Sequence, residues 1–332
     1  MVIWSTEMKI VVVSLFDGLS GGRIAFDRVE DVEVVRYYSS EIDKYAIQVA
    51  DVNYPQDTPY RLGDITKVDG IKLLSEIREE FGDIDIVLIG GSPCQGFSMA
   101  GKMKGSSTAC GIDVTSLEQY MDLKAQDFEF NGQSYLFWEF VRLQKEINPK
   151  YFMLENVRIT KKWLPMFNET MGTEVQVIFS SKVVPQRRER FYWHNIAGVG
   201  QPQQKEYDVS DFFGGDGFPS SCDVSRFFKR KEIFNTLTAT YWKGIRGSSR
   251  PTVSAREGFL DEDRDAHRML TAEECEKLQT IPIGYTNCVS KTQRYKMIGN
   301  GWTIDVVAHI FRHIPIQEVV EEIDKTNTVQ DS

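Results

Sequence analysis

The chain has 332 residues, of which 41% are hydrophobic and 26% charged, and its formal net charge is −9. No run approaches the roughly 18 apolar residues of a membrane span, and the N-terminus lacks the pattern of a signal peptide. Five cysteines without a CxxC spacing and four histidines without a cluster argue against zinc and against a disulfide framework. We therefore expect an intracellular protein with reduced thiols, built as one large α/β domain plus a smaller one.

Apolar runs alternate with helical stretches through the first half of the chain, which predicts a doubly wound, mostly parallel sheet with crossover helices. The expected strands are residues 9–16, 32–43, 83–91, 149–157, 174–181 and 188–196, with a short strand or loop just before residue 63. A Gly-rich turn at residues 17–22 opens a helix after the first strand. The stretch "SYLFWEFVRLQKEI", residues 134–147, has helical spacing.

The pattern changes after about residue 198, where a stretch rich in Gly, Pro and Ser has no clear period. We expect a large domain over residues 1–197, a small irregular domain over 198–268 and a return to the large domain over 269–332. Thr271 and Glu274 form a capping-box pattern at the start of a helix. The segment "MIGNGWTIDVVAHIFRHI", residues 297–314, predicts a tight turn and an apolar helix that packs on the first domain.

The segment between Arg226 and Arg256 holds eight basic residues against the single acid Glu232, and five aromatic residues lie among them. The net negative charge of the whole chain argues against a nucleic-acid partner, but the distribution of charge along the chain does not. A charge run alone is about as often a solvated surface as a binding site. Next to the acidic remainder, this basic segment favours a local phosphate-binding surface.

Three features at the ends of expected strands indicate a cofactor that carries a nucleoside. The Gly-rich turn follows a buried strand, Glu41 stands where a ribose hydroxyl pair is held, and Asp64 stands within reach of an adenine amino group. The turn has neither the GxGxxG spacing of dinucleotide sites nor the lysine of a P-loop, so phosphate binding is not favoured. S-adenosylmethionine fits this description better than a dinucleotide.

Cys94 follows Pro93 at the carboxyl end of the expected strand at residues 83–91. A lone cysteine there is more often a packing residue than a nucleophile. Glu155, however, ends another strand of the same sheet, and "PQRRER" presents Arg187, Arg188 and Arg190. A thiolate that attacks an electron-poor ring needs an acid to protonate the ring and cations to hold its polar edge. Cysteine, glutamate and arginine supply those parts without histidine or metal.

In order and over nearly the whole chain, the motifs resemble those of the cytosine-C5 DNA methyltransferase family: "LFDGLSGG", "SEID", "GDI", "GGSPCQGFS", "LFWEF", "ENV", "PQRRER", "LTAEECEKLQ" and "IGNGWT". Each is a modest signal alone, and the ordered set is highly specific. The opening "SLFDG", the stretch "RFYWHNIAG" and the tryptophan after the final glycine resemble the de novo vertebrate-type branch in particular. The resemblance implies a sheet of the S-adenosylmethionine-dependent methyltransferase type. It also implies methyl transfer to C5 of a cytosine flipped out of duplex DNA.

The resemblance further implies roles for individual residues. Cys94 would attack ring carbon C6, and Glu155 would contact N3 and the exocyclic amine. Arg190 would contact O2, and Arg188 would support the cysteine side of the site. Contacts to S-adenosylmethionine would come from Phe16, Asp17, Gly18, Gly21, Glu41, Ile42, Asp64, Ile65, Leu136, Asn300, Gly301 and Trp302. Contacts to the cytosine and its DNA would come from Pro93, Gln95, Ser98, Asn156, Arg230, Thr238, Thr240, Lys243 and Arg246.

Two segments depart from the family pattern. Residues 106–133 are acidic and longer than many members carry. They either lengthen the loop that closes over flipped DNA or form a separate surface element. Residues 198–268 would be the target-recognition domain, which is short for the family.

Three alternatives stay open beside a DNA methyltransferase. A tRNA methyltransferase of the same fold usually carries a cysteine-phenylalanine-threonine signature, which is absent here. A non-catalytic DNA-binding or stimulatory homologue would be expected to lose the cysteine, the glutamate or the arginines. The third alternative is an enzyme that makes a different modification at C5 with another one-carbon donor.

We expect double-stranded DNA as the partner, with no metal and no membrane, and we leave the oligomeric state open. A chain that is nearly all catalytic fold favours a bacterial or phage origin. The expected location is then the cytoplasm, or the nucleus if the source is eukaryotic. Restriction-modification or protection of phage DNA are the expected roles.

Overall fold

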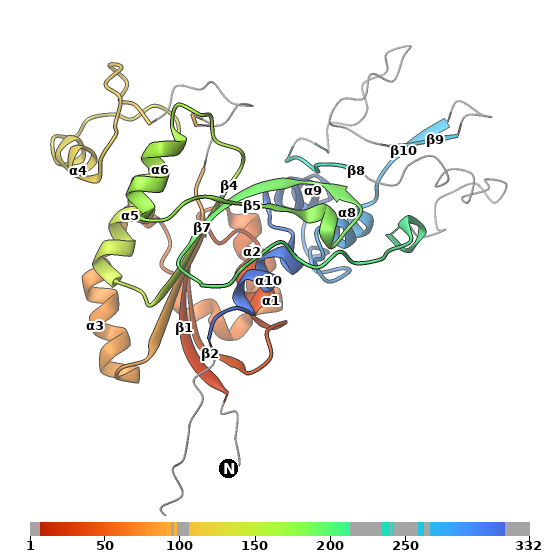
Figure 1. Ribbon diagram of the computed structural model, residues 1–332, viewed down its shortest axis with the longest axis horizontal. Helices are drawn as coiled ribbons and strands as arrows, with labels where there is room; N and C mark the ends of the chain where they lie inside the picture. Colours follow the sequence, from red (N-terminus) through yellow and green to blue (C-terminus); the bar gives the residue numbers. More distant parts are fainter. Residues whose placement is uncertain are drawn as a thin grey trace, which may run out of the picture.

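The computed structural model describes residues 7–93, 96–97, 106–212, 234–239, 241, 258–261 and 266–315 (Figure 1). Within these ranges a six-stranded sheet has the order β2-β1-β3-β4-β7-β5. β2, β1, β3 and β4 are parallel, and β7 runs antiparallel to β4 and to β5. The predicted mostly parallel sheet is therefore confirmed. Its strands are β1 (Met8–Leu15), β2 (Val32–Ser40), β3 (Asp85–Gly91), β4 (Tyr151–Asn156), β5 (Gln176–Phe179) and β7 (Glu189–His194).

Helices cover both faces of the sheet, because the strands are apolar on both sides. Along β1, Ile10 and Val12 pack into one core, whereas Val11 and Val13 pack into the other. The first core is closed by α1 (Gly21–Phe26), α2 (Lys44–Asn53), α8 (Ala272–Leu278), α9 (Lys291–Asn300) and α10 (Ile304–Phe311). The second is closed by α3 (Gly70–Phe81), α4 (Leu117–Ala125), α5 (Leu136–Ile147) and α6 (Leu164–Met171), on the left in Figure 1.

Short elements complete the described chain. Where a short strand or loop was expected before residue 63, residues 55–60 form a 3-10 helix, and Arg61 makes an isolated bridge to Ser39. Pro55 and Pro59 lack the N–H that a ladder strand needs, which explains the helix. The other short elements are the 3-10 helices η2 (Ile65–Lys67), η3 (Ser180–Lys182) and η4 (Val209–Phe212), and the strands β6 (Gln186–Arg187), β8 (Phe234–Asn235), β9 (Gly258–Asp261) and β10 (Ala266–Met269).

Residues 106–133, called the insert below, form an element of their own on the surface. Two isolated bridges, between Ser107 and Asp113 and between Thr108 and Phe130, fold its ends together around α4. Tyr120 of α4 is buried, and its hydroxyl donates to Glu139 of α5. This packing favours a separate surface element over a longer closing loop.

The helices near the C-terminal end of the described chain pack against N-terminal elements. α10 packs on α1, with the rings of Phe26 and Phe311 stacked at 4.2 Å. The capping box of Thr271 and Glu274 is present at the start of α8. The predicted tight turn lies at residues 301–303, between the end of α9 at Asn300 and the start of α10 at Ile304. Gly299 lets the end of α9 lie against the backbone of Thr238, since a Cβ at residue 299 would lie 2.3 Å from the Thr238 carbonyl carbon.

The predicted domain boundary at residue 198 stays a prediction. Residues that follow it make hydrogen bonds to the large body, from Gln176 Nε2 to the Val199 carbonyl at 2.6 Å and from the Lys205 N–H to the Lys182 carbonyl at 2.8 Å. Most of the basic segment 226–256 lies outside the described residues.

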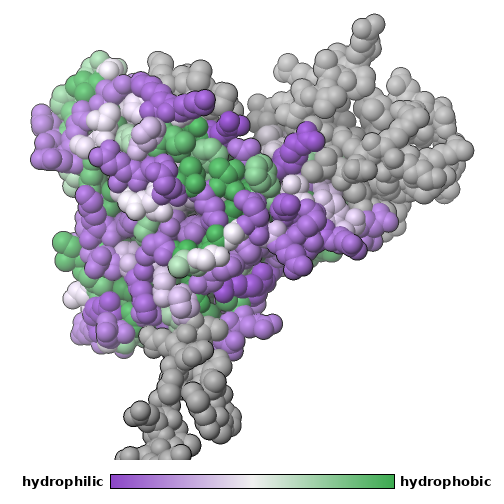
Figure 2. Space-filling model, in the orientation of Figure 1, coloured by the Kyte–Doolittle hydropathy of each residue, from purple (hydrophilic) through white to green (hydrophobic). Residues whose placement is uncertain are grey.

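None of the described helices has the length and apolar character that crossing a bilayer requires. On the face shown in Figure 2, hydrophilic residues surround several separate groups of apolar ones.

Candidate active site

The loop after β1 is held by a buried carboxylate. Asp17 accepts hydrogen bonds from the hydroxyls of Ser14 at 2.7 Å, Ser20 at 2.8 Å and Tyr37 at 2.6 Å. Burial raises its pKa from 3.8 to about 6, and the three hydroxyl donors offset part of that rise. The neighbouring Phe16 has φ 57, which is uncommon for an aromatic residue and is fixed here by this network.

Glu41, just after β2, ties this loop to the next one. One carboxylate oxygen accepts the Gly18 N–H at 2.8 Å, and the other accepts the N–H groups of Ile42 and Asp43, both at 2.7 Å. A carboxylate has about four acceptor positions, so Glu41 retains capacity for a ribose hydroxyl. The Ile42 side chain is 67% exposed and therefore available to pack on a flat ring.

Asp64 caps the short helix η2 on the same edge. Its Oδ1 accepts the Thr66 N–H at 3.0 Å and the Thr66 hydroxyl at 2.9 Å. Both hydrogen bonds that the Asp64 side chain makes among the described residues use this one oxygen, which leaves Oδ2 for an adenine amino group. Ile65 is buried, and Leu136 at the start of α5 is half-buried in the same core.

Glu155 stands at the end of β4, where it is 8% exposed. Arg190 Nε lies 3.0 Å from Oε1, and the indole N–H of Trp302 donates to Oε2 at 3.1 Å. Gly91 makes room for this group, because a Cβ there would lie 3.0 Å from Glu155 Oε2 and 3.1 Å from Trp302 Nε1. Gly21 flanks the other side, 3.7 Å from Trp302 Cε3 by the same measure. Trp302 thus connects the loop after β1, which ends at Gly21, to the Glu155 carboxylate.

Arg188 is buried and fixes the backbone around the site. Its guanidinium donates to the carbonyls of Leu237 at 3.1 Å, Gly299 at 3.4 Å and Gly301 at 2.6 Å. Burial lowers its pKa to about 9, with the neighbouring Arg190 acting in the same direction. Its Nε has no partner among the described residues. Arg188 lies between β6 and β7. Its hydrogen bonds therefore connect this part of the chain to the backbone at Leu237 and to the backbone at the end of α9.

The residues on both sides of Cys94 are held in place. Asn156 Nδ2 donates to the carbonyl and hydroxyl of Ser92, both at 3.3 Å. On the other side, the Gly96 N–H donates to the Ser134 hydroxyl at 2.7 Å. Phe97 is fully buried, with its ring edge-on to Phe167 at 5.0 Å.

The structure brings together most of the predicted cofactor residues with Glu155, Asn156, Arg188 and Arg190, while Asn300 is exposed at the end of α9. Pro93 is half-buried, and Thr238 contributes its backbone beside Gly299. Seven predicted site residues lie outside the described ones: Cys94, Gln95, Ser98, Arg230, Thr240, Lys243 and Arg246. Sequence reasoning missed Ser14, Tyr37 and Ser134. Ser14, a polar residue inside an apolar strand, was the available signal.

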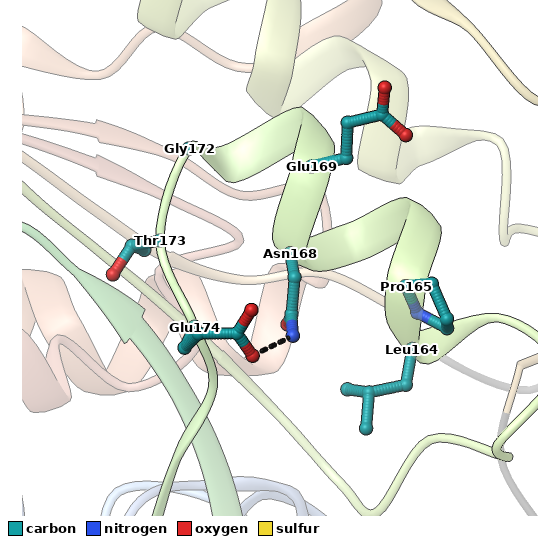
Figure 3. A pocket seen from close by; sticks show the side chains of 7 residues that line it. All are labelled: Leu164, Pro165, Asn168, Glu169, Gly172, Thr173 and Glu174. Carbon is teal, nitrogen blue, oxygen red and sulfur yellow. Dashed lines mark hydrogen bonds between the residues drawn. The ribbon is translucent and has the colours of Figure 1, made fainter.

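A surface hollow of about 540 Å³ lies elsewhere, along one face of α6 and the turn that follows it (Figure 3). Asn168 and Glu174 are hydrogen-bonded to each other on its wall. Its lining contains none of the predicted site residues, so we assign it no part in the activity.

An α/β sheet with such groups at the carboxyl ends of its strands fits a methyltransferase that uses S-adenosylmethionine: Glu41 retains acceptor capacity for a ribose, and the exposed Ile42 can pack on a flat ring. Comparison with known proteins defines it further. The family model for C-5 cytosine-specific DNA methylases matches residues 10–212 and 204–315, and the chain belongs to this family. It is a DNA cytosine-5 methyltransferase.

Individual relatives agree with this assignment. Type II methyltransferase M1.ScrFI of Lactococcus lactis subsp. cremoris is 28% identical, over 96% of this chain and 80% of its own. Orphan methyltransferase M.Rho11sI of Bacillus phage rho11s is 31% identical, over 58% of this chain and 33% of its own. The solved Entamoeba histolytica methyltransferase EhMeth shares the fold, with a TM-score of 0.64, 16% identity and coverage of 92% and 97%. These comparisons give no support to the predicted likeness to the vertebrate de novo branch.

Proposed function

We propose that this chain methylates cytosine in duplex DNA through a covalent bond between Cys94 and ring carbon C6 of a flipped-out base. The Cys94 thiolate adds to C6. Glu155 delivers a proton to N3 and accepts from the exocyclic amine, while Arg190 holds O2. These contacts make C5 electron-rich. Arg188 acts through the backbone that it fixes around Arg190 and Gly301.

The cofactor, when bound, supplies an electrophilic methyl group. Phe16 and Ile42 hold its base, Glu41 its ribose and Asp64 its adenine edge. Methyl transfer to C5 would leave S-adenosylhomocysteine. A water molecule would then take the C5 proton, the electrons of that C–H bond would form the C5–C6 double bond and expel the Cys94 thiolate, and N3 would return its proton to Glu155. The products are 5-methylcytosine, S-adenosylhomocysteine and the free enzyme.

One observation carries this proposal. Gly91 of β3 pairs directly with Glu155 of β4, so the strand that leads to Cys94 ends beside the carboxylate. Only Ser92 and Pro93 separate that pair from Cys94 in the chain. The carboxyl ends of parallel strands meet at one edge of the sheet, which supports a proposal that the cysteine and the acid act together.

Labelled S-adenosylmethionine and duplex DNA test the proposal. We expect label on cytosine with the native chain and loss of at least about a thousandfold in rate with Cys94→Ser, because serine is a far weaker nucleophile. Cys110→Ser is the matched control, since Cys110 is an exposed free thiol. Activity retained by Cys94→Ser, or label transferred to tRNA and to no DNA, would overturn it.

We further infer that residues 198–268 read the target bases, with Arg230, Thr238, Thr240, Lys243 and Arg246 among the contacts. The names of the relatives support a role in restriction-modification or as a phage orphan enzyme, acting in the cytoplasm. Bisulfite sequencing of DNA from cells that express the chain would give the target sequence. Resistance of that DNA to an endonuclease of the same sequence would test the protective role.

A further inference from the structure

The insert docks on α5 through a buried carboxylate. Glu139 of α5 is 0% exposed. Its Oε1 accepts from the Tyr120 hydroxyl and from Lys124 Nζ at 2.5 Å, and both donors belong to α4 of the insert. Its Oε2 accepts from Arg142 Nε at 2.8 Å. A buried carboxylate needs such partners, so α4 is fixed relative to α5.

The same two cations also hold the turn that carries Asp64. Lys124 Nζ donates to the Thr66 carbonyl at 3.3 Å, and Arg142 Nη2 donates to the Ile65 carbonyl at 3.2 Å. These carbonyls directly follow Asp64, whose own side chain folds back onto Thr66. A lysine of the insert thus forms a hydrogen bond to the backbone next to the proposed adenine contact.

A second contact joins the insert to the same end of the cofactor site. The ring of Tyr135 stacks on Phe130 of the insert at 4.9 Å and lies 6.2 Å from the ring of Tyr120. Tyr135 immediately precedes Leu136, another proposed cofactor residue. Burial raises the pKa of Tyr135, and the charge of Asp64 acts in the same direction.

We propose that the insert positions the adenine-recognising turn, and that Lys124 is the positioning residue that sets affinity for the adenine base. The inference rests on the proposed contacts of Asp64 and Ile65 with adenine. Without the Lys124 ammonium, Glu139 keeps one cation and the Thr66 carbonyl loses its donor. The turn then samples orientations in which Asp64 no longer faces the amino group. Glu155 and Arg190 are held separately, so the chemical step is unaffected.

The experiment compares four full-length chains: the native one, Lys124→Met, Lys124→Arg and Lys162→Met. Lys162 is the matched control, because it pairs with Asp113 of the insert at 3.5 Å on the exposed surface. Binding of S-adenosylhomocysteine is measured by calorimetry without DNA. We expect about tenfold weaker binding for Lys124→Met, as for loss of one charge-assisted hydrogen bond. We expect Lys124→Arg within about threefold of native, and Lys162→Met unchanged.

Kinetics separate positioning from general damage. Lys124→Met should raise KM for S-adenosylmethionine about as much as it weakens binding, while kcat changes less than about twofold. Tyr120→Phe, which keeps the ring stacking and removes the hydroxyl, should show the same split in smaller measure. This second variant decides the matter if Lys124→Met folds poorly, as judged by its melting temperature.

A ligand with the amino group replaced gives the sharpest readout. S-inosylhomocysteine carries a carbonyl where adenine has its amino group, so a well-placed Asp64 should reject it. We expect the native chain to discriminate strongly and Lys124→Met to discriminate several-fold less. Unchanged discrimination in Lys124→Met, or native affinity for S-adenosylhomocysteine, would overturn the inference. A native chain that binds both ligands equally would instead overturn the adenine contact of Asp64, and with it the role given to Lys124.

Discussion

At the scale of single residues, Trp302 connects two halves of the site through one hydrogen bond. Its indole N–H donates to Glu155 Oε2 at 3.1 Å while its ring lies between Gly21 and Gly91. Trp302→Phe keeps most of the ring and removes the donor. We expect kcat to fall by about 10- to 100-fold, since a hydrogen bond to a charged group contributes about 1.5–3 kcal/mol.

Trp138→Phe is the matched control for Trp302→Phe. Trp138 is also buried, and its indole N–H has no partner among the described residues. The control should lower stability without a comparable loss of kcat. Equal effects of the two substitutions on kcat in a steady-state assay would contradict the assigned role of the Trp302 N–H.

Asp17 gives a pH-dependent prediction. Its pKa is 3.8 as a free side chain and about 6 in the folded chain, because burial disfavours its charged form. The unfolded chain therefore ionises first, and the contribution of Asp17 to stability, full below about pH 4, is lost as pH rises through about 6. The loss is on the order of 3 kcal/mol.

Asp17→Asn keeps the shape of the side chain and removes the charge, so Ser14 and Tyr37 can still donate to Oδ1. We expect the melting temperature of the variant, relative to the native chain, to be higher at about pH 7.5 than at about pH 4.5. Thermal denaturation at both pH values checks this. A difference that stays constant with pH would refute it.

At the scale of elements, α10 is held on α1 by aromatic stacking and an ion pair. Phe26 and Phe311 stack at 4.2 Å, and Arg28 lies 2.6 Å from Asp305. Phe26→Ala leaves a cavity in this contact and should lower the free energy of unfolding by about 3–5 kcal/mol. Val52→Ala, at a 61% exposed position on α2, should change it by less than about 0.5 kcal/mol. Urea titration measures both.

Elements with a local signal were predictable from the sequence. The apolar runs give β1 to β5 and β7, and the Thr271–Glu274 pattern gives the start of α8. The contacts that hold the end of α9 were not predictable. Arg188 donates to the carbonyls of Gly299, in the last turn of α9, and of Gly301, which follows it, and Gly299 lets α9 approach Thr238. Such contacts leave no periodic trace in the sequence.

The site was predictable where the chemistry lies in a contiguous motif and unpredictable where it depends on packing. Glu155, Arg190 and Glu41 follow from their motifs. The bond between Trp302 and Glu155 joins residues 147 positions apart and needs the space that Gly91 leaves. Likewise Tyr37 reaches Asp17 because β2 lies beside β1 in register. Sheet order and side-chain room set these contacts.

At the scale of the whole molecule, the net charge of −9 contrasts with the basic segment 226–256. A DNA-binding role for that segment predicts strong salt dependence, because each phosphate contact releases counterions. Lys243→Gln with Arg246→Gln should weaken duplex binding and reduce the slope of log affinity against log salt by about 1.8. Fluorescence anisotropy between about 50 and 200 mM salt measures this slope. Lys72→Gln, at an exposed position on α3, should leave the slope unchanged, and an unaltered slope in the double variant would disprove the assignment.

The packing of α10 on α1 also bears on how the chain folds. The ion pair between Arg28 and Asp305 spans 277 positions, so a segment that is synthesised earlier is covered by one that is synthesised much later. Until residues 304–311 emerge from the ribosome, the apolar face of α1 lacks its cover. Contacts of such long range close slowly. During synthesis, α1 and β1 therefore expose a surface prone to misassociation. We expect folding yield to depend on how quickly α10 docks.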